Sequence, residues 1–340
     1  MSRKEIYTVD LFCGAGGAST GLEEALKRKQ MKHKGLAINH WAVAVDTMKR
    51  NHPDIDTKQM SIDEAVPADL VPGGEVDLLW ASPSCTHHSR AKGGKPRSNQ
   101  LRAQPELVLT WLDQLFVRRV IIENVQEFVE WGPLNKDGKP IKRLKGACFQ
   151  TWVKAIEARN YTVEWRIVNC ADYGDATSRR RFFLKAVRKG CGKIHWPEPT
   201  HAENPQPDLF GTELKKWRGV RECLDLNDRG RSIFNREKPF ILDMSRPGGN
   251  DSGHIRPANK PIQTLTTCDN VQGVFPMLED GRLIDIRIRM LKPSELAKAH
   301  SFPPDYVLTG NRGEQVKQIG NSVPVRTAAA MCEADLREVG

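Results

Sequence analysis

The sequence lacks the cysteine spacing, the long apolar runs and the leader segment that mark several common protein classes. Its eight cysteines are scattered and no two form a C-x-x-C pair, so neither a zinc ribbon nor a disulfide framework is predicted. No apolar stretch approaches the roughly 20 residues that cross a bilayer. No apolar run followed by a small-residue cleavage site stands near the start, so we do not expect secretion. We therefore expect reduced thiols and a cytoplasmic protein without a membrane or metal partner.

Acidic residues are missing from three segments of the chain. The 340 residues carry 52 Lys and Arg against 42 Asp and Glu, a formal net charge of +10. Residues 86–104 hold five basic side chains and no acid, residues 179–189 hold six, and residues 139–145 hold four. One basic run is often only a solvated face. Three such runs in one chain favour a polyanionic partner, most simply nucleic acid.

The order of strand-like and helix-like stretches predicts an α/β fold. In the first 190 residues the two kinds alternate, as in a mainly parallel sheet covered by helices. We expect strands over 6–12, 35–39, 76–81, 117–125, 162–170 and 181–187, and helices over 18–29, 43–51, 105–116 and 148–159. Glycine and proline then become frequent, with short β-like runs at 261–267 and 273–277, which predicts a second, smaller, irregular domain at 190–285. Helices return at 293–300 and 324–336.

The first expected strand runs into a glycine turn, Phe12-Cys13-Gly14-Ala15-Gly16-Gly17, and then into a helix. Glycines let the backbone approach a ligand closely, and a helix N-terminus offers free N–H groups. Ligands of open α/β sheets bind at such carboxyl strand ends. The spacing is not G-x-G-x-x-G, so a dinucleotide site is not predicted. A turn that only tightens packing is the alternative.

Two later strands also end in residues that could carry chemistry. One leads into Ser82-Pro83-Ser84-Cys85 and then into the first basic segment. A thiol at a strand end beside positive charge can have a lowered pKa and act as a nucleophile. The alternatives are a buried apolar cysteine, or a metal cluster with His87 and His88 that lacks a matching ligand pair downstream. The next strand delivers Glu123 to its carboxyl end, where an ordinary strand-ending acid is the alternative reading.

The glycine turn, Cys85 and Glu123-Asn124-Val125, in this order, resemble three motifs of the cytosine-C5 DNA methyltransferases. Three further stretches are similar to that family: Ser178-Arg179-Arg180-Arg181 to its Q-x-R-x-R motif, Arg289–Glu295 with Ser301-Phe302-Pro303 to its penultimate motif, and Gln318–Pro324 to its closing motif. Only 190–285 lacks a shared pattern, and there the family has its variable target-recognition domain.

The resemblance implies a Rossmann-like doubly wound methyltransferase sheet with a second, smaller, irregular β-rich domain. Residues 1–189 would form the catalytic and cofactor-binding domain, completed by 286–340, and 190–285 would recognise the target. It also implies S-adenosylmethionine as the methyl donor. The implied cofactor-binding residues are Phe12, Gly14, Gly16, Gly17, His40, Trp41, Ser61, Ile62, Asn321, Ser322 and Val323. His40 and Ser61 stand where the family has acids, with Asp63 close to the second.

The implied reaction is methylation of carbon 5 of cytosine in a specific duplex sequence. Cys85 would add to carbon 6, Glu123 would bind N3, and Arg181 would contact O2. The base must leave the duplex for this chemistry, so base flipping is expected. Arg179, the other arginine of its motif, is also expected to be a catalytic residue. In that motif Thr177 replaces the glutamine, and before the cysteine Ser84 replaces the usual proline. The residues expected to bind DNA are Ser89, Arg90, Lys92, Lys95 and Arg97 in the first basic segment, and Thr264 and Leu265 further along.

Two other functions stay open. An RNA (tRNA) cytosine-C5 methyltransferase would use the same scaffold, but the residues at 190–285 favour DNA because the RNA-modifying members have a much reduced recognition region. A catalytically silent DNA-binding relative would explain the substitutions at His40, Ser61 and Ser84, but it would not need the cysteine, glutamate and two arginines of the reaction. We expect a monomeric, nucleoid-associated protein of bacterial or phage origin that belongs to a restriction-modification system.

Overall fold

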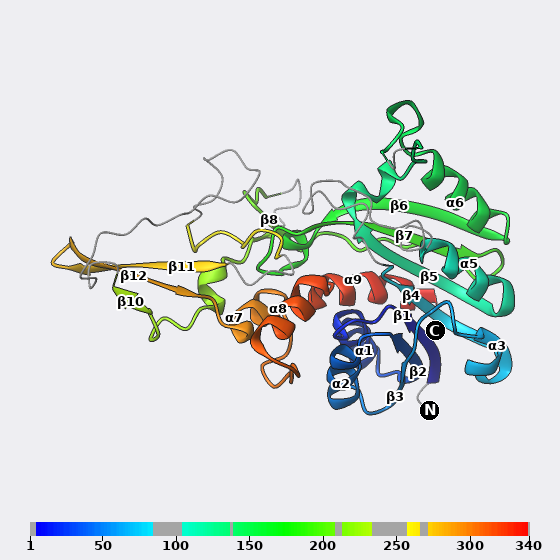
Figure 1. Ribbon diagram of the computed structural model, residues 1–340, viewed down its shortest axis with the longest axis horizontal. Coiled ribbons are helices and arrows are strands. Elements are labelled where there is room, and N and C mark those ends of the chain that lie inside the picture. Colours follow the sequence, from blue (N-terminus) through cyan, green and yellow to red (C-terminus); the bar gives the residue numbers. More distant parts are fainter. Residues whose placement is uncertain are drawn as a thin grey trace.

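A seven-stranded sheet, in the order β3-β2-β1-β4-β5-β7-β6, forms the centre of the computed structural model (Figure 1). The structure describes residues 5–83, 104–136, 139–207, 213–232, 257–265 and 271–338. The strands are β1 (Glu5–Leu11), β2 (Lys32–Asn39), β3 (Ile55–Gln59), β4 (Glu75–Ala81), β5 (Phe116–Val125), β6 (Tyr161–Asn169) and β7 (Arg180–Arg188). Neighbouring strands are parallel except that β7 runs antiparallel to both β5 and β6. The predicted α/β, Rossmann-like fold is confirmed.

Alternate side chains of the strands face two helical layers. On β1, Val9 and Leu11 pack in the cluster that contains buried residues of α5 (Gln104–Gln114) and α6 (Ala147–Glu157). Ile6 points the other way and packs with α1 (Gly17–Lys29) and α9 (Val325–Asp335). This alternation follows from the two-residue period of a strand. The short helix α3 (Pro67–Leu70) lies on the first face, and α2 (Ala42–Asn51) packs against β2 and β3.

The elements that the structure adds to those expected from the sequence include one strand of the main sheet and one helix near the C-terminus. Strand β3 was not predicted, because only Ile55 and Thr57 of its five residues are buried and the rest read as a polar loop. Helix α8 (Arg312–Asn321) was not predicted either, since glycine stands near both of its ends. Helix α7 (Pro293–Ala299) begins at the proline predicted for it.

Within 190–285 the described residues form small sheets. Strands β10 (Arg231–Ser232), β12 (Arg282–Met290) and β11 (Gln272–Glu279) make a three-stranded sheet, and β8 (His201–Ala202) pairs with β9 (Lys215–Lys216). The β11–β12 hairpin projects far from the seven-stranded sheet (Figure 1). It contains the predicted run at 273–277. At 261–265 the structure has only an isolated bridge at Ile262, and 266–267 lies outside the described residues. The division at 190–285 stays a prediction, and β12 runs across its second boundary.

A buried charge cluster joins the sheet to the last helix. Lys185 on β7 lies 2.8 Å from one carboxylate oxygen of Asp335, and Arg119 on β5 lies 3.5 Å from the other. All three side chains are at most 2% exposed. Both cations also donate to backbone carbonyl groups, so the cluster is well supplied with hydrogen bonds. The C-terminal end of α9 is thereby fixed on the sheet.

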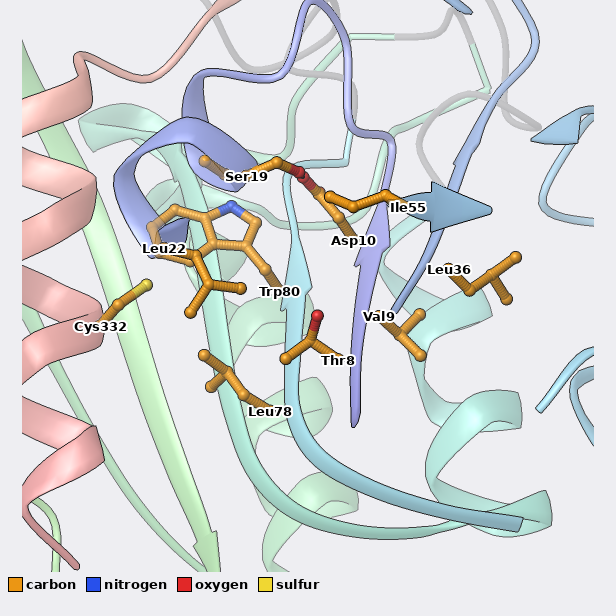
Figure 2. A pocket seen from close by; sticks show the side chains of 11 residues that line it. Thr8, Val9, Asp10, Ser19, Leu22, Leu36, Ile55, Leu78, Trp80 and Cys332 are labelled. Atoms are coloured by element: carbon orange, nitrogen blue, oxygen red, sulfur yellow. The ribbon is translucent and has the colours of Figure 1, made fainter. Parts of the chain in front are cut away.

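A second buried acid, Asp10, lies on β1 itself. Asp10 accepts a hydrogen bond of 2.6 Å from the Ser19 hydroxyl, and the two side chains border a small cavity of about 10 Å³ together with Trp80 and Cys332 (Figure 2). The other carboxylate oxygen of Asp10 has no hydrogen-bond partner among the described residues. Burial raises the pKa of Asp10 to about 7, although Ser19 and His52 favour its ionised form.

Removal of the shared carboxylate should destabilise the protein. Asp335→Ala would leave Lys185 and Arg119 buried without their counter-ion, which costs about 3–5 kcal/mol. We expect chemical denaturation to show a loss of this size in the free energy of unfolding. Glu333→Ala, on the same helix and in an exposed ion pair with Arg28, is the matched control and should cost less than about 1 kcal/mol. Equal losses in the free energy of unfolding of Asp335→Ala and Glu333→Ala would contradict a stabilising role for the buried charge cluster.

Asp10 should make stability depend on pH. Its pKa is raised to about 7 in the folded chain from 3.8, so the native state holds a proton that the unfolded state releases as pH rises from about 4 to 7. The wild type therefore loses stability over this window, whereas Asp10→Asn does not. The stability of the variant relative to wild type should rise by more than about 1.4 kcal/mol between pH 4 and pH 8. The exposed Asp69→Asn is the control, and a flat difference for Asp10→Asn would refute this reading.

Candidate active site

The carboxyl ends of the parallel strands meet at one edge of the sheet, and the loops that follow them are joined there. The Ser82 amide donates to the Leu11 carbonyl at 3.1 Å, linking the loops after β4 and β1. The Cys13 amide donates to Ile38 on β2, and the Met60 amide donates to Asn39. The residues expected to bind a cofactor therefore come from strands whose ends are hydrogen-bonded to one another, as in other open α/β sheets.

The glycine turn after β1 is open on one side and tightly packed on the other. Phe12, Gly14 and Gly16 have φ values of +62°, +54° and +80°. A Cβ atom on Gly14 would meet nothing nearer than the Phe12 carbonyl oxygen, at 4.0 Å. On Gly17, in contrast, it would collide with Ser322 and the Val323 carbonyl. Phe12 is not a glycine, and left-handed backbone of this kind is costly and concentrates at functional sites.

The closing motif of the sequence returns to this turn. Ser322 and Val323 follow α8 directly, are buried, and lie against Gly17. Val323 also packs in the same cluster as Ala18 and Leu22 of α1. Asn321 is the last residue of α8 and is exposed. The structure therefore places two of the three closing residues in contact with the first turn.

The ends of β2 and β3 contribute the remaining cofactor candidates. His40 is exposed, whereas Trp41 is partly buried and its amide donates to the Asn39 side chain at 2.9 Å. The Lys317 ammonium lies 4.2 Å from the centre of the Trp41 ring, which is a cation–π contact from α8. The Trp41 ring is thus held from the C-terminal part of the chain, a contact that sequence patterns did not indicate.

Ser61 and Ile62, the two candidates after β3, differ in whether their side chains can reach a ligand. Ile62 is 6% exposed and packs in the core, so its side chain faces away from solvent. The Ser61 hydroxyl donates to the Asp63 carboxylate, and its amide donates to Glu64 at 3.3 Å. Two exposed carboxylates therefore flank Ser61, where the resemblance had implied an acid.

Glu123 and Arg181 form a pair on neighbouring strands. Glu123 lies near the end of β5 and Arg181 on the antiparallel β7, with Arg181 Nε 3.0 Å from Glu123 Oε1. Both side chains are less than 10% exposed. Next to them, the Asn124 side chain donates to the Pro83 carbonyl at 3.1 Å, which fixes the last described residue before Ser84. The sequence indicated Asn124 only as part of a motif, and the structure adds its contact with the segment after β4.

Arg179 joins three segments that are far apart in the sequence. Its guanidinium donates to the Leu265 carbonyl at 3.1 Å and to the Gly320 carbonyl at 2.9 Å. The same junction continues where the Ser178 amide donates to the Ile262 carbonyl and the Ile262 amide donates to the Ala176 carbonyl. Thr264 is partly buried, whereas Leu265 is 4% exposed and packs in a core cluster with the residues of α7. Contact of Thr264 and Leu265 with DNA stays a prediction.

Several predicted site residues lie outside the residues that the structure describes. They are Cys85 and the DNA-binding candidates Ser89, Arg90, Lys92, Lys95 and Arg97. In the described ranges, no three His, Cys, Asp or Glu side chains are grouped so that they could hold a metal ion. No helix of the described chain is long and apolar enough to cross a membrane.

A polar network behind the glycine turn was missed by sequence reasoning. Glu23 of α1, His52 after α2 and Tyr306 after α7 meet there, and the Tyr306 hydroxyl donates to the Ala15 carbonyl. Tyr306 stands shortly after the Ser301-Phe302-Pro303 motif, but no periodicity relates it to the first turn. Only the folded chain brings these residues together.

Comparison with known proteins agrees with the geometry. The family model for C-5 cytosine-specific DNA methylases matches residues 6–335. Type II methyltransferase M1.HphI of Haemophilus parahaemolyticus is 28% identical over 351 residues, which cover 97% of this chain and 86% of that protein. Type II methyltransferase M.SacI of Streptomyces achromogenes is 24% identical over 377 residues, covering 99% of this chain and 94% of that protein.

Solved structures share the fold at lower identity. The Entamoeba histolytica methyltransferase EhMeth has a TM-score of 0.68 at 16% identity, and the S. pombe Dnmt2 methyltransferase has 0.66 at 17%. Each comparison covers 99% of this chain and 100% of the other. Because the family model spans almost the whole chain, the protein belongs to the C-5 cytosine-specific DNA methylases and is a DNA cytosine-5 methyltransferase.

Proposed function

We propose that the protein transfers a methyl group from S-adenosylmethionine to carbon 5 of cytosine in a specific duplex DNA sequence, by base flipping and a covalent Cys85 intermediate. The observation that carries the proposal is the Glu123–Arg181 pair beside the anchored Pro83. Cys85 stands two positions after Pro83, and two residues of chain span at most about 7 Å. Cys85 itself lies outside the described residues, and we propose that it acts beside this pair.

The glycine turn fits S-adenosylmethionine. Among the described residues, no atom lies nearer to a Cβ position on Gly14 than the Phe12 carbonyl oxygen, at 4.0 Å, and the first amides of α1 lack partners within the helix. Trp41 offers a partly exposed ring for the adenine, and Asp63 and Glu64 beside Ser61 offer carboxylates for its amino group. The candidates Phe12, Gly16, Gly17, His40, Ile62, Asn321, Ser322 and Val323 would shape the remainder of this pocket. When bound, the cofactor supplies a methyl group on a positively charged sulfur.

The side chains near Glu123 account for the activation of the base. The Cys85 thiolate would add to carbon 6 and move electron density toward carbon 5, which would take the methyl group as the bond from that group to the cofactor sulfur breaks. Glu123, carrying a proton, would donate it to N3, and Arg181, oriented by its ion pair, would donate to O2, so both would stabilise the charge that develops on the ring. Loss of the proton from carbon 5 and elimination of Cys85 complete the reaction. Arg179 would hold backbone segments in place, since its guanidinium donates to the Leu265 and Gly320 carbonyls.

DNA binding would involve two parts of the chain. The basic segment with Ser89, Arg90, Lys92, Lys95 and Arg97 would contact phosphates around the flipped base. The domain predicted at 190–285, with Thr264 and Leu265 at its return to the sheet, would read the bases. The Arg179 hydrogen bond to the Leu265 carbonyl would couple recognition to the catalytic side. Because one flipped base needs one active site, we propose a monomer.

The relatives suggest a cellular role. The type II methyltransferases M1.HphI and M.SacI match nearly the whole chain, so we propose that this protein modifies DNA within a restriction-modification system, in the cytoplasm and near the nucleoid. The Dnmt2 neighbour is 17% identical and therefore supports the fold alone. RNA methylation stays the alternative.

The proposal is tested by transfer of label from methyl-tritiated S-adenosylmethionine to unmethylated duplex DNA, with tRNA in parallel. We expect label in 5-methylcytosine of DNA. Label in tRNA alone would establish the RNA alternative, and label in neither, with DNA binding retained, would establish a silent relative.

Cys85→Ser should abolish turnover while DNA binding is retained. Serine is a much weaker nucleophile, and loss of a covalent nucleophile lowers kcat by more than about 1,000-fold. Steady-state kinetics and DNA gel-shift assays check both parts. Cys148→Ser, on α6, is the control with the same change of side chain. Turnover by Cys85→Ser at the wild-type rate would show that the nucleophile is another group.

Glu123→Gln should slow the chemical step and leave cofactor binding nearly unchanged. The amide keeps the shape of the side chain but cannot protonate N3, a loss worth about 10²–10⁴-fold in rate. Single-turnover kinetics and calorimetric titration with S-adenosylmethionine measure the two effects. Glu130→Gln, in a surface ion pair with Lys145, is the control. A large loss of cofactor affinity in Glu123→Gln would instead assign this residue to the cofactor pocket.

A further inference from the structure

A chain of polar contacts runs from the surface of α1 to the backbone of the glycine turn. The Glu23 carboxylate lies 2.8 Å from Nδ1 of His52, whose side chain is 1% exposed. The other ring nitrogen, Nε2, lies 3.2 Å from the hydroxyl oxygens of both Thr20 and Tyr306. Tyr306 in turn donates to the Ala15 carbonyl at 2.5 Å. The chain therefore ends on the residue between Gly14 and Gly16.

We propose that Tyr306 is a positioning residue of the cofactor turn, and that His52 holds it in place with protons on both ring nitrogens. This inference rests on the proposed S-adenosylmethionine site. It adds three residues, Tyr306, His52 and Glu23, whose roles the reaction itself does not define. None of them needs to touch the cofactor.

The count of donors and acceptors assigns the protons. Thr20 donates its hydroxyl proton to the Gly16 carbonyl at 2.7 Å, and Tyr306 donates its own to Ala15. With their protons so placed, both hydroxyl oxygens present lone pairs to His52, and we assign the donor at this contact to Nε2. Nδ1 faces a carboxylate, which is an acceptor, so it also carries a proton. His52 and Glu23 thus form a buried charge-assisted pair.

The position of Tyr306 is fixed independently of the turn. Residues 307–309, which come after Tyr306, lie along α2. There Asn51 exchanges hydrogen bonds with the Val307 backbone, and Thr309 hydrogen-bonds Thr47. The Tyr306 ring packs on Phe302, with 4.7 Å between ring centres. Tyr306 is therefore a fixed point from which the Ala15 carbonyl can be oriented.

The same residues leave no free space around Gly16. A Cβ atom there would lie 2.6 Å from the Tyr306 hydroxyl oxygen and 2.9 Å from His52 Nε2. Both contacts are shorter than the packing of real side chains allows. The network thus occupies the inner side of the turn, and the open side at Gly14 remains for the ligand.

Other ionisable groups face this network. Asp10 interacts electrostatically with His52 from β1, and His33 on β2 does so as well. Burial raises the Tyr306 pKa far above its ordinary value. Negative charge on Cys13, Glu23 and Asp10 raises this pKa as well, so the hydroxyl keeps its proton. The Tyr306 hydroxyl is therefore a donor at every pH at which the enzyme would be assayed.

The first test compares two tyrosines by calorimetric titration with S-adenosylmethionine and by steady-state kinetics. Tyr306→Phe removes one hydrogen bond to the turn, and we expect the Kd and KM for the cofactor to rise about tenfold with kcat within twofold. Tyr161→Phe removes a similar buried hydrogen bond, to the Val117 carbonyl, far from the turn, and should leave cofactor affinity unchanged. Equal affinities in wild type and Tyr306→Phe would overturn the positioning role. If the wild type itself bound no S-adenosylmethionine, the proposed function would fail and this role with it.

The second test needs no cofactor. Nitrogen-15 NMR of histidine-labelled protein at pH 7 should show both His52 ring nitrogens protonated, and Glu23→Gln should lose one of these protons. A single protonated nitrogen in the wild type would overturn the assignment to His52, whatever the outcome of cofactor binding.

Discussion

The return of the C-terminal segment to the first turn is the contact on which the site depends. Gly17 and Gly21 of α1 have no room for a Cβ atom, because Ser322, Val323 and Ala328 fill that space. The turn after β1 therefore acquires its shape from residues at the far end of the chain. Its inner side is closed by Tyr306 and His52, and its outer side is open. A cofactor site of this kind exists only in the complete fold, since neither end of the chain could form it alone.

Buried charges hold the other long-range junctions. Asp335 joins α9 to two strands through Lys185 and Arg119, and Arg179 joins β7 to the segments at Leu265 and Gly320. Such contacts are directional, so they fix orientation as well as proximity. The Glu123–Arg181 pair lies on the same strands as these junctions. The geometry of the proposed catalytic side is thus tied to that of the proposed cofactor side through the sheet.

Much of this could be predicted from local sequence patterns. Strands β4 and β5 contain short apolar runs, Leu78–Ala81 and Val120–Ile122, and both strands were predicted to within one residue. The glycine turn and Glu123 follow directly from strand ends. Strand β3 was missed because it is short and half polar. Tyr306, His52 and Lys317 were missed for another reason. Their roles depend on contacts between distant segments, and no pattern within a segment encodes such contacts.

The proposed reaction depends on a covalent bond between Cys85 and carbon 6 of the methylated cytosine. Duplex DNA containing 5-fluorocytosine tests it directly. Carbon 5 then carries fluorine in place of the hydrogen that must be lost as a proton, so Cys85 cannot be eliminated. With S-adenosylmethionine present, we expect a protein–DNA complex that survives denaturation, with the DNA attached to the peptide containing Cys85. Methylation of ordinary DNA without such a complex, or attachment at another residue, would contradict the account.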